Sequence, residues 1–237
     1  MDRKLDGFCV RLYADVGEYW ESKQNQLEST GSLKFGIFYS PVEKRGPDLM
    51  IIGANPGFDS DDDTKQPPSQ NLFYDPIGRK KEEWKISAKL RELFKGVDRE
   101  ETLRASVVTN LLFFKSRCLG LDKDKSRRQG WCDNSNAAVR REIEKFCCDK
   151  VEKIVCEVAP QRILVLGLGT WDKIAEPPTQ TLDRTPRSRL VVGGRVFGKK
   201  ALGMIHPTGA QVSNKNICKL AYRLKNFLAE VEPTGKP

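Results

Sequence analysis

The stretch from Asp48 to Gly57 reads D-L-M-I-I-G-A-N-P-G and decides the fold of the chain. Its apolar run has the length of a short strand buried on both faces, and Asn-Pro-Gly is a turn sequence that ends it. Three more apolar runs fit buried strands, at 105–111, 163–166 and 201–205. Apolar residues at helical spacing lie around these runs, at 84–94, 139–158 and 217–227.

Strands that alternate with helices predict an α/β protein. We expect three αβα layers around a central, mostly parallel four-stranded sheet. An amphipathic helix over 5–19 and an alternating strand over 33–39 precede this unit as an N-terminal extension. Gly193-Gly194 splits the apolar run 190–197, which predicts a hairpin. The whole chain, 1–237, is predicted to be one domain, with 231–237 as a frayed tail.

The composition is that of a globular protein, with 237 residues of which 38% are apolar. This excludes collagen-like, fully disordered and small disulfide-stabilised classes. Lys and Arg number 41 against 32 Asp and Glu, which gives a net charge of +9. Such a balance favours an anionic partner, nucleic acid or a membrane surface, although a soluble enzyme can also be basic.

The seven cysteines contain no Cys-x-x-Cys pair, and the chain has one histidine. We therefore expect free thiols in a reducing compartment, with neither a metal site nor a cofactor. The longest apolar run, 105–114, is interrupted by polar residues, and the N-terminus lacks an apolar signal segment. We expect an intracellular protein without a membrane partner, and a monomer.

Ligands of parallel α/β sheets bind beyond the carboxyl ends of the strands. The four predicted strands end at Asn55, at Asn110, at Gly167-Leu168-Gly169 and at His206. The only histidine and two asparagines therefore lie on one predicted rim. Each residue alone has an ordinary explanation, as a turn, a backbone hydrogen bond or a strand end. Their joint position favours a functional site.

Two short motifs on this rim are similar to those of a known superfamily. Gly53-Ala54-Asn55-Pro56-Gly57 resembles the first motif of the uracil-DNA glycosylases, and His206-Pro207-Thr208-Gly209-Ala210 resembles the second. The combination is closest to the single-strand-selective monofunctional (SMUG-like) branch, and the resemblance spans roughly 48–226. It implies the uracil-DNA glycosylase-like fold and an enzyme that flips a base out of DNA and hydrolyses its N-glycosidic bond.

The sequence departs from this family pattern in three places. Thr208 stands where the second motif usually has serine. The loop after Gly57 carries an acidic run, which we interpret as a solvated loop, with Asp59, Asp61, Asp62 and Asp63. Some branches hold an iron–sulfur cluster, and Cys147 or Cys148 falls near one ligand position, but the paired N-terminal cysteines are missing. We expect no cluster.

The resemblance assigns the catalytic roles to Asn55 and His206. Asn55 would hold the attacking water for a sugar with oxocarbenium character. His206 would donate a hydrogen bond to uracil O2 as negative charge develops, and a neutral imidazole is sufficient for this. Asn110 would read the base, because its carboxamide can accept from uracil N3–H and donate to O4, groups that cytosine reverses. The competing explanation for Asn110 is a hydrogen bond to backbone.

A flipped base also needs a stacking partner and a grip on the DNA backbone. The loop 72–76 resembles the family's stacking loop, which favours Phe73, with Tyr74 and Phe58 as alternatives; packing inside the loop is the ordinary explanation. Gly53 is assigned to the same base-recognition set. The candidates for phosphate contacts form two groups. The first group contains Lys115, Arg117, Lys123, Arg127 and Arg128. In the second group, the candidates are Arg187 and Arg189, and Arg184, Arg195, Lys199 and Lys200 lie near them in the sequence.

Taken together, these features predict a monofunctional enzyme of base excision repair that removes uracil from DNA, with oxidised or other deaminated bases as further candidates. Its partner would be single-stranded or duplex DNA, in a nucleoid or a nucleus. The alternative is a protein of the same fold that binds single-stranded or modified nucleic acid without cleaving it.

Overall fold

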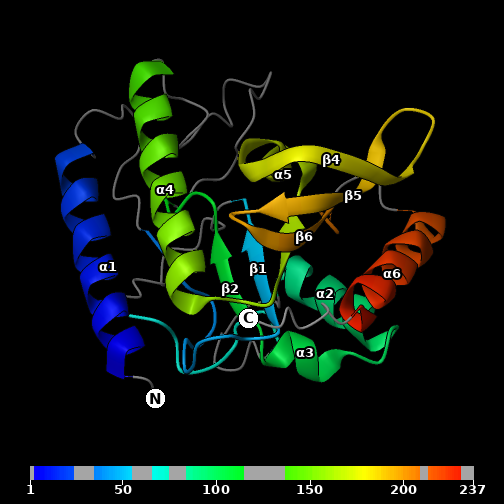
Figure 1. The fold of residues 1–237 in the computed structure, drawn as a ribbon, viewed down its shortest axis with the longest axis horizontal. Helices are drawn as coiled ribbons and strands as arrows, with labels where there is room; N and C mark the ends of the chain where they lie inside the picture. The colour runs from blue at the N-terminus through cyan, green and yellow to red at the C-terminus, as the bar shows by residue number, and fades with distance from the viewer. Residues whose placement is uncertain are drawn as a thin grey trace, which may run out of the picture.

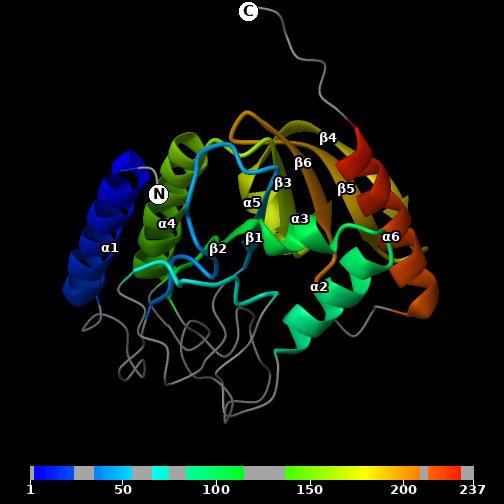
Figure 2. The same cartoon turned by 90° about the horizontal axis from the view of Figure 1, so that it is seen from below.

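The computed structural model describes residues 3–23, 35–54, 66–74, 84–114, 137–208 and 213–230. Within these ranges, one mixed sheet holds six strands in the order β2-β1-β3-β6-β5-β4, with helices on both faces (Figure 1, Figure 2). The strands are β1 (Leu49–Gly53), β2 (Val107–Asn110), β3 (Arg162–Leu166), β4 (Ala175–Arg184), β5 (Arg189–Val196) and β6 (Lys199–Met204). The helices are α1 (Arg3–Lys23), α2 (Lys85–Lys95), α3 (Glu100–Arg104), α4 (Ala137–Val158), α5 (Leu168–Ile174) and α6 (Asn214–Ala229).

The four strands expected from the apolar runs form the parallel part of the sheet. β1 pairs in parallel with β2 and β3, and β3 pairs in parallel with β6. Every residue of β1 is buried, because Met50 and Ile52 face the core under α1 and α4 while Leu49 and Ile51 face the core under α2 and α6. Burial on both faces is the reason that this strand has a continuous apolar sequence rather than an alternating one.

The prediction of a four-stranded, mostly parallel sheet is wrong, because two further strands extend the sheet in antiparallel orientation. β5 pairs with β6 and β4 pairs with β5, both antiparallel. β4 has the polar sequence A-E-P-P-T-Q-T-L-D-R and lies at the edge of the sheet. An edge strand needs fewer backbone donors and buries fewer side chains, so it tolerates prolines and lacks a readable apolar pattern.

The predicted hairpin turn at Gly193-Gly194 is also wrong, since both glycines lie inside β5. The chain instead turns between β5 and β6 at Phe197 and Gly198, which both have positive φ. Packing explains the glycines inside the strand. A Cβ at Gly193 would lie 3.1 Å from Leu182, and one at Gly194 would lie 3.4 Å from the ring of Trp171.

The N-terminal extension contains the predicted helix but not a regular strand. α1 lies against α4, where the rings of Tyr19 and Phe146 stack with centroids 3.6 Å apart. Of the predicted strand, residues 35–39 are described, and they form only isolated bridges from Phe35 to Phe114 and from Phe38 to Thr109. No continuous ladder forms, because the two bridges differ in register by two residues. Beyond them, the hydroxyl of Ser40 accepts from the N–H of Val108 at 2.8 Å.

The predicted helices around 84–94, 139–158 and 217–227 are confirmed as α2, α4 and α6. α4 ends directly before Ala159, which has a φ of 51°, and Pro160. None of the described helices has a stretch apolar and long enough to cross a membrane.

Candidate active site at the carboxyl rim of the sheet

The parallel strands end together at one rim, in the order β2, β1, β3, β6. Gly53 of β1 is level with Asn110 of β2, and Leu166 of β3 is level with Met204 of β6. His206 follows Met204, the last residue of β6, by two positions, and therefore lies at the same carboxyl rim. Three strand spacings of about 4.8 Å separate β2 from β6, or about 14 Å. Asn110 and His206 are therefore placed to contact opposite ends of one ligand rather than each other.

The side chain of Asn110 lies over Gly53. A Cβ at residue 53 would overlap the Oδ1 of Asn110, so glycine is required there for the carboxamide to keep its place. Gly53 and Asn110 share the sheet face of Ile51 and Val108, which belong to the core under α2 and α6. The predicted base-reading residue and the predicted motif glycine thus form one unit.

Asn110 is a buried residue, 4% exposed. Within the described part of the chain, no hydrogen bond joins its carboxamide to backbone or to another side chain. The competing explanation, a backbone hydrogen bond at the strand end, therefore has no described partner. Because buried polar groups are normally hydrogen-bonded, an amide in this position suits a ligand that brings its own donor and acceptor.

His206 lies at the surface of the rim, and its Nδ1 is 2.9 Å from the Oγ1 of Thr208. The protein around the ring removes enough water to lower the pKa of His206 below its ordinary value, which favours the neutral imidazole. In the tautomer that carries its proton on Nε2, the Thr208 hydroxyl donates to Nδ1 and Nε2–H can donate to a ligand. Threonine thus supplies the hydroxyl that serine has in the family motif.

The loop with Phe73 and Tyr74 is held by Asn71, a residue that sequence reasoning missed. The buried Asn71 donates from Nδ2 to the carbonyl of Leu103 at 2.9 Å, and its Oδ1 accepts from the N–H of Phe73 at 3.0 Å. An asparagine that bonds the backbone two residues on is a known turn device, so the pattern N-L-F could have indicated it.

The ring of Phe73 packs inward, whereas Tyr74 is half-buried. Phe73 is 7% exposed, and its ring centroid lies 6.1 Å from that of Tyr39 and 5.8 Å from that of Trp84. The ring of Tyr74 lies 4.4 Å from the guanidinium of Arg104. The described contacts of Phe73 therefore join it to the core under α2, and not to Asn110 or His206; its stacking role stays a prediction.

The second group of basic residues is divided between the two ends of the β5 strand. β5 is antiparallel to β6, so its start is at the carboxyl rim, where Ile205 N–H donates to the carbonyl of Leu190 at 2.9 Å. Arg187 is exposed at this end, and Arg189 forms an ion pair with Asp172 at 2.6 Å. Arg195, Lys199 and Lys200 lie at the opposite end, around the β5–β6 turn. Only the first set can contact a ligand at the rim.

Several predicted site residues lie outside the described residues. They are the water-holding Asn55, the motif residues Pro56, Gly57 and Gly209, the alternative stacking residue Phe58, the acidic run from Asp59 to Asp63, and Lys115, Arg117, Lys123, Arg127 and Arg128. The predicted site residues at the rim that the structure describes are Gly53, Asn110, His206, Pro207 and Thr208.

Cys147 and Cys148 fall near a ligand position of the iron–sulfur cluster that some branches hold, but their chemistry does not favour metal binding. Cys147 is fully buried, and burial raises the pKa of its thiol to about 12, which disfavours the thiolate that metals bind. Burial also raises the pKa of Cys148. In the ranges that the structure describes, no three His, Cys, Asp or Glu side chains gather into a group that could hold a metal ion.

Compared with protein-family models and with curated proteins, the chain matches none. The resemblance to the uracil-DNA glycosylases therefore rests on the two motifs and on the rim that carries them. Chemically, the described part of that rim offers a carboxamide with a donor and an acceptor over β1, and an imidazole N–H beyond β6. This pair suits a flat, polar ring that becomes an anion when it leaves.

Proposed function

We propose that the protein is a monofunctional DNA glycosylase that removes uracil from DNA. The observation that carries the proposal is the shared rim, where the carboxamide of Asn110, which has no hydrogen-bond partner among the described residues, and the imidazole of His206 lie at the ends of β2 and β6, on either side of β1 and β3. Neither residue is explained by packing alone. The basic end of the β4–β5 hairpin beside His206 supports an anionic substrate.

Each residue has a definite task in this reaction. The bond between uracil N1 and the sugar C1′ breaks, and its electron pair leaves with uracil. The Nε2–H of His206 donates to uracil O2 as the charge develops, a contribution of about a hundred- to a thousandfold in rate for one such donor. Asn110 binds N3–H and O4. Asn55 orients the water whose oxygen forms the new bond to C1′, and the proton of that water passes to solvent.

Base release from defined oligonucleotides tests the proposal. Purified protein is incubated with single-stranded, U:G and U:A substrates, and abasic sites are revealed as alkali-sensitive strand breaks. We expect release of uracil, a loss of at least a hundredfold in His206→Ala and Asn55→Ala, and none in Val10→Ala, at an exposed position on α1. Salt-sensitive binding without any base release would instead identify a non-catalytic nucleic-acid-binding protein.

A further inference from the structure

Two neighbouring segments of the described structure are strongly basic. Residues 182–190, at the tip of the β4–β5 hairpin, contain three arginines and one aspartate, and α6 contains four Lys/Arg and no acid. Together the two segments carry a net charge of +6. Charge gathered in this way on one side of a protein attracts polyanions more strongly than the same charge spread over the surface.

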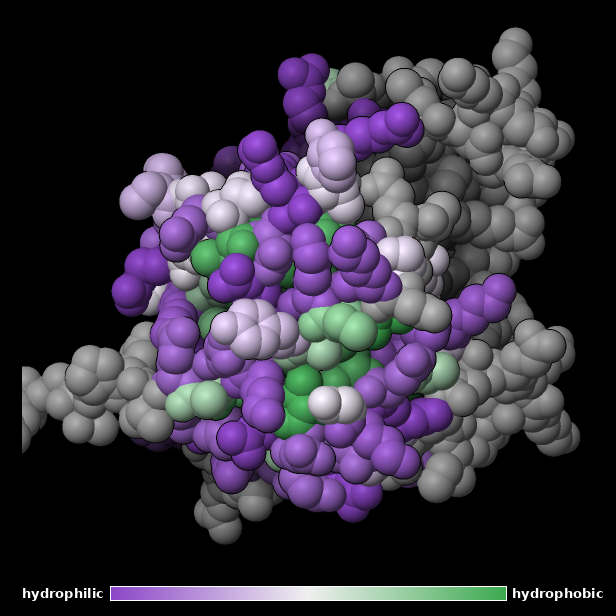
Figure 3. Space-filling view, turned by 90° about the vertical axis from the view of Figure 1, so that its right-hand side faces the viewer, coloured by the Kyte–Doolittle hydropathy of each residue, from purple (hydrophilic) through white to green (hydrophobic). Residues whose placement is uncertain are grey.

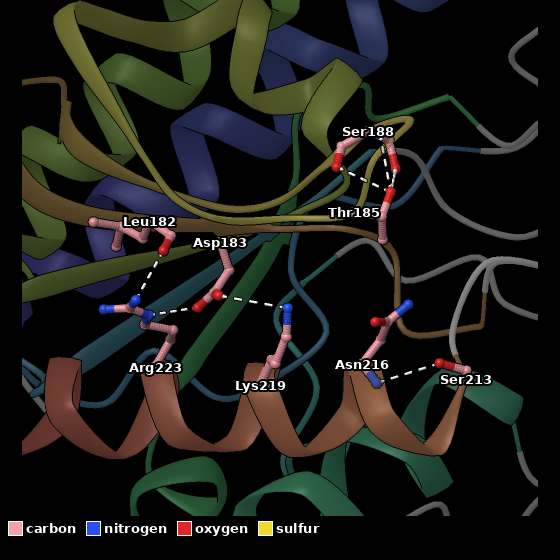
Figure 4. Close-up of polar contacts among 8 residues, drawn as sticks. All are labelled: Leu182, Asp183, Thr185, Ser188, Ser213, Asn216, Lys219 and Arg223. Carbon is pink, nitrogen blue, oxygen red and sulfur yellow. Dashed lines mark hydrogen bonds and ion pairs between the residues drawn. The ribbon is translucent and has the colours of Figure 1, made fainter.

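Asp183 fixes the hairpin against α6 (Figure 4). Its carboxylate accepts from Arg223 Nε at 2.6 Å and lies 3.9 Å from Lys219 Nζ, while Arg223 also donates to the carbonyl of Leu182 at 2.8 Å. The tip itself is a compact turn, in which the N–H of Ser188 donates to the Thr185 hydroxyl at 3.0 Å. The two basic segments therefore form one surface rather than two independent ones.

Asp183 occupies Arg223 and Lys219, but three cations of this surface remain available. Arg184, Arg187 and Lys215 are exposed, and none of the described acidic residues forms an ion pair with them. Lys215, Lys219 and Tyr222 follow each other at four- and three-residue intervals, so they line one face of α6. Figure 3 shows this side of the molecule, whose described surface is largely hydrophilic.

Tyr222 adds an aromatic ring to the basic surface. The residue is 60% exposed, and Arg223 lies 5.6 Å from its ring centroid. Basic residues interleaved with an exposed aromatic ring are the combination with which proteins hold single strands, because cations bind phosphates and the ring stacks on an unpaired base. A membrane surface would instead call for a group of exposed apolar residues.

We propose that the β4–β5 tip and the exposed face of α6 form an accessory binding surface for a single nucleic-acid strand. Arg184, Arg187 and Lys215 contact phosphates, and Tyr222 stacks on an unpaired base. The surface is continuous with the candidate site, because Leu190 and Ile205 are hydrogen-bonded at the rim. The inference rests on the proposed function in that the strand held here is the one whose base enters the site.

The hairpin provides its own control. Arg184→Ala with Arg187→Ala removes two cations from the rim end, and Arg195→Ala with Lys199→Ala removes two from the other end. Binding to a uracil-free, fluorescent single-stranded oligonucleotide is measured by anisotropy between about 50 and 200 mM salt. We expect the slope of log K against log salt to fall by about 1.4 for the first pair, at about 0.7 per contact, and to stay unchanged for the second.

Tyr222→Ala separates stacking from charge. We expect about five- to hundredfold weaker binding of the single strand at every salt concentration, with Tyr222→Phe restoring it. Equal losses in both double variants, or no loss in the first, would overturn the proposal. The proposal would also be overturned if the Arg184→Ala, Arg187→Ala variant bound phosphatidylserine-containing vesicles more weakly but bound the oligonucleotide as well as the wild type does. Because the oligonucleotide has no uracil, this binding assay does not depend on glycosylase activity. If the wild-type protein binds the strand here but releases no uracil from uracil-containing substrates, the accessory surface stands and the proposed reaction is wrong.

Discussion

The hydroxyl of Thr208 lies 2.9 Å from Nδ1 of His206, the only histidine of the chain. In the tautomer whose Nε2 carries the proton that the proposed reaction needs, the Thr208 hydroxyl donates to Nδ1. We expect Thr208→Val to lower single-turnover uracil release by about five- to tenfold, the worth of one neutral hydrogen bond. Thr208→Ser should keep the rate, because it keeps the hydroxyl. Equal rates in the two variants would show that the hydroxyl does not orient the ring.

The pKa of His206 can be measured directly, because a single histidine gives a single imidazole resonance. The loss of water around the ring lowers this pKa below the ordinary value of about 6.5, although His206 lies at the surface. We therefore expect the Cε1–H resonance to titrate at lower pH in the folded protein than in urea. The unfolded chain then binds more protons at mildly acidic pH, so stability should rise as pH rises towards about 6.5 and level off above it.

Replacement of His206 by Asn provides the control for this pH dependence. The variant should lose the part of the stability change that lies between the folded and unfolded pKa values, as measured by urea unfolding at several pH values. A folded-state titration at or above the unfolded one would contradict the neutral imidazole on which the proposed role depends.

Gly53 and Asn110 should behave as a coupled pair. Gly53→Ala places a Cβ where the Oδ1 of Asn110 lies, so the carboxamide or the strand must move. We expect a loss of about 1–3 kcal/mol in the free energy of unfolding and reduced discrimination between uracil and cytosine. In an Asn110→Ala background the overlap is gone, and the cost of Gly53→Ala should largely disappear. Additive losses in urea unfolding would show that the two side chains do not compete for space.

The parts of the fold that could be predicted from sequence are those in which both faces of an element are buried. β1 and β3 have continuous apolar sequences for that reason, and α4 and α6 have apolar stripes because one face of each lies on the sheet. β4 could not be predicted, since an edge strand exposes most of its residues. The register that brings Gly53 beside Asn110 is a tertiary property that neither motif contains.

The role of a glycine in this fold could not be predicted reliably from the sequence. The prediction that Gly167 ends a strand is confirmed, but Gly167, with a φ of 97°, also directly precedes α5, a helix of seven residues that was not predicted. Gly193 and Gly194 have the composition of a turn, yet they lie inside β5 beneath neighbouring side chains. The sequence alone does not distinguish a glycine required because there is no space for a side chain from a glycine required for its backbone conformation. Only the packing around each glycine distinguishes the two.

Gly203 in β6 is the strongest example of a glycine kept for lack of space. A Cβ there would lie 2.7 Å from Cδ2 of Trp171 and 2.7 Å from Cγ2 of Val192. Both side chains are almost fully buried, so neither can move aside without disturbing the core. We expect Gly203→Ala to lower the free energy of unfolding by about 1–3 kcal/mol in urea.

Gly169 is the matched control, because it lies in the neighbouring α5 and a Cβ there would meet no atom within 4 Å. Gly169→Ala should leave stability unchanged or raise it by up to about 1 kcal/mol, as alanine favours the helix. If Gly203→Ala were as stable as Gly169→Ala, Trp171 would have room to shift, and the close approach of β6 to α5 would not be what requires glycine at 203.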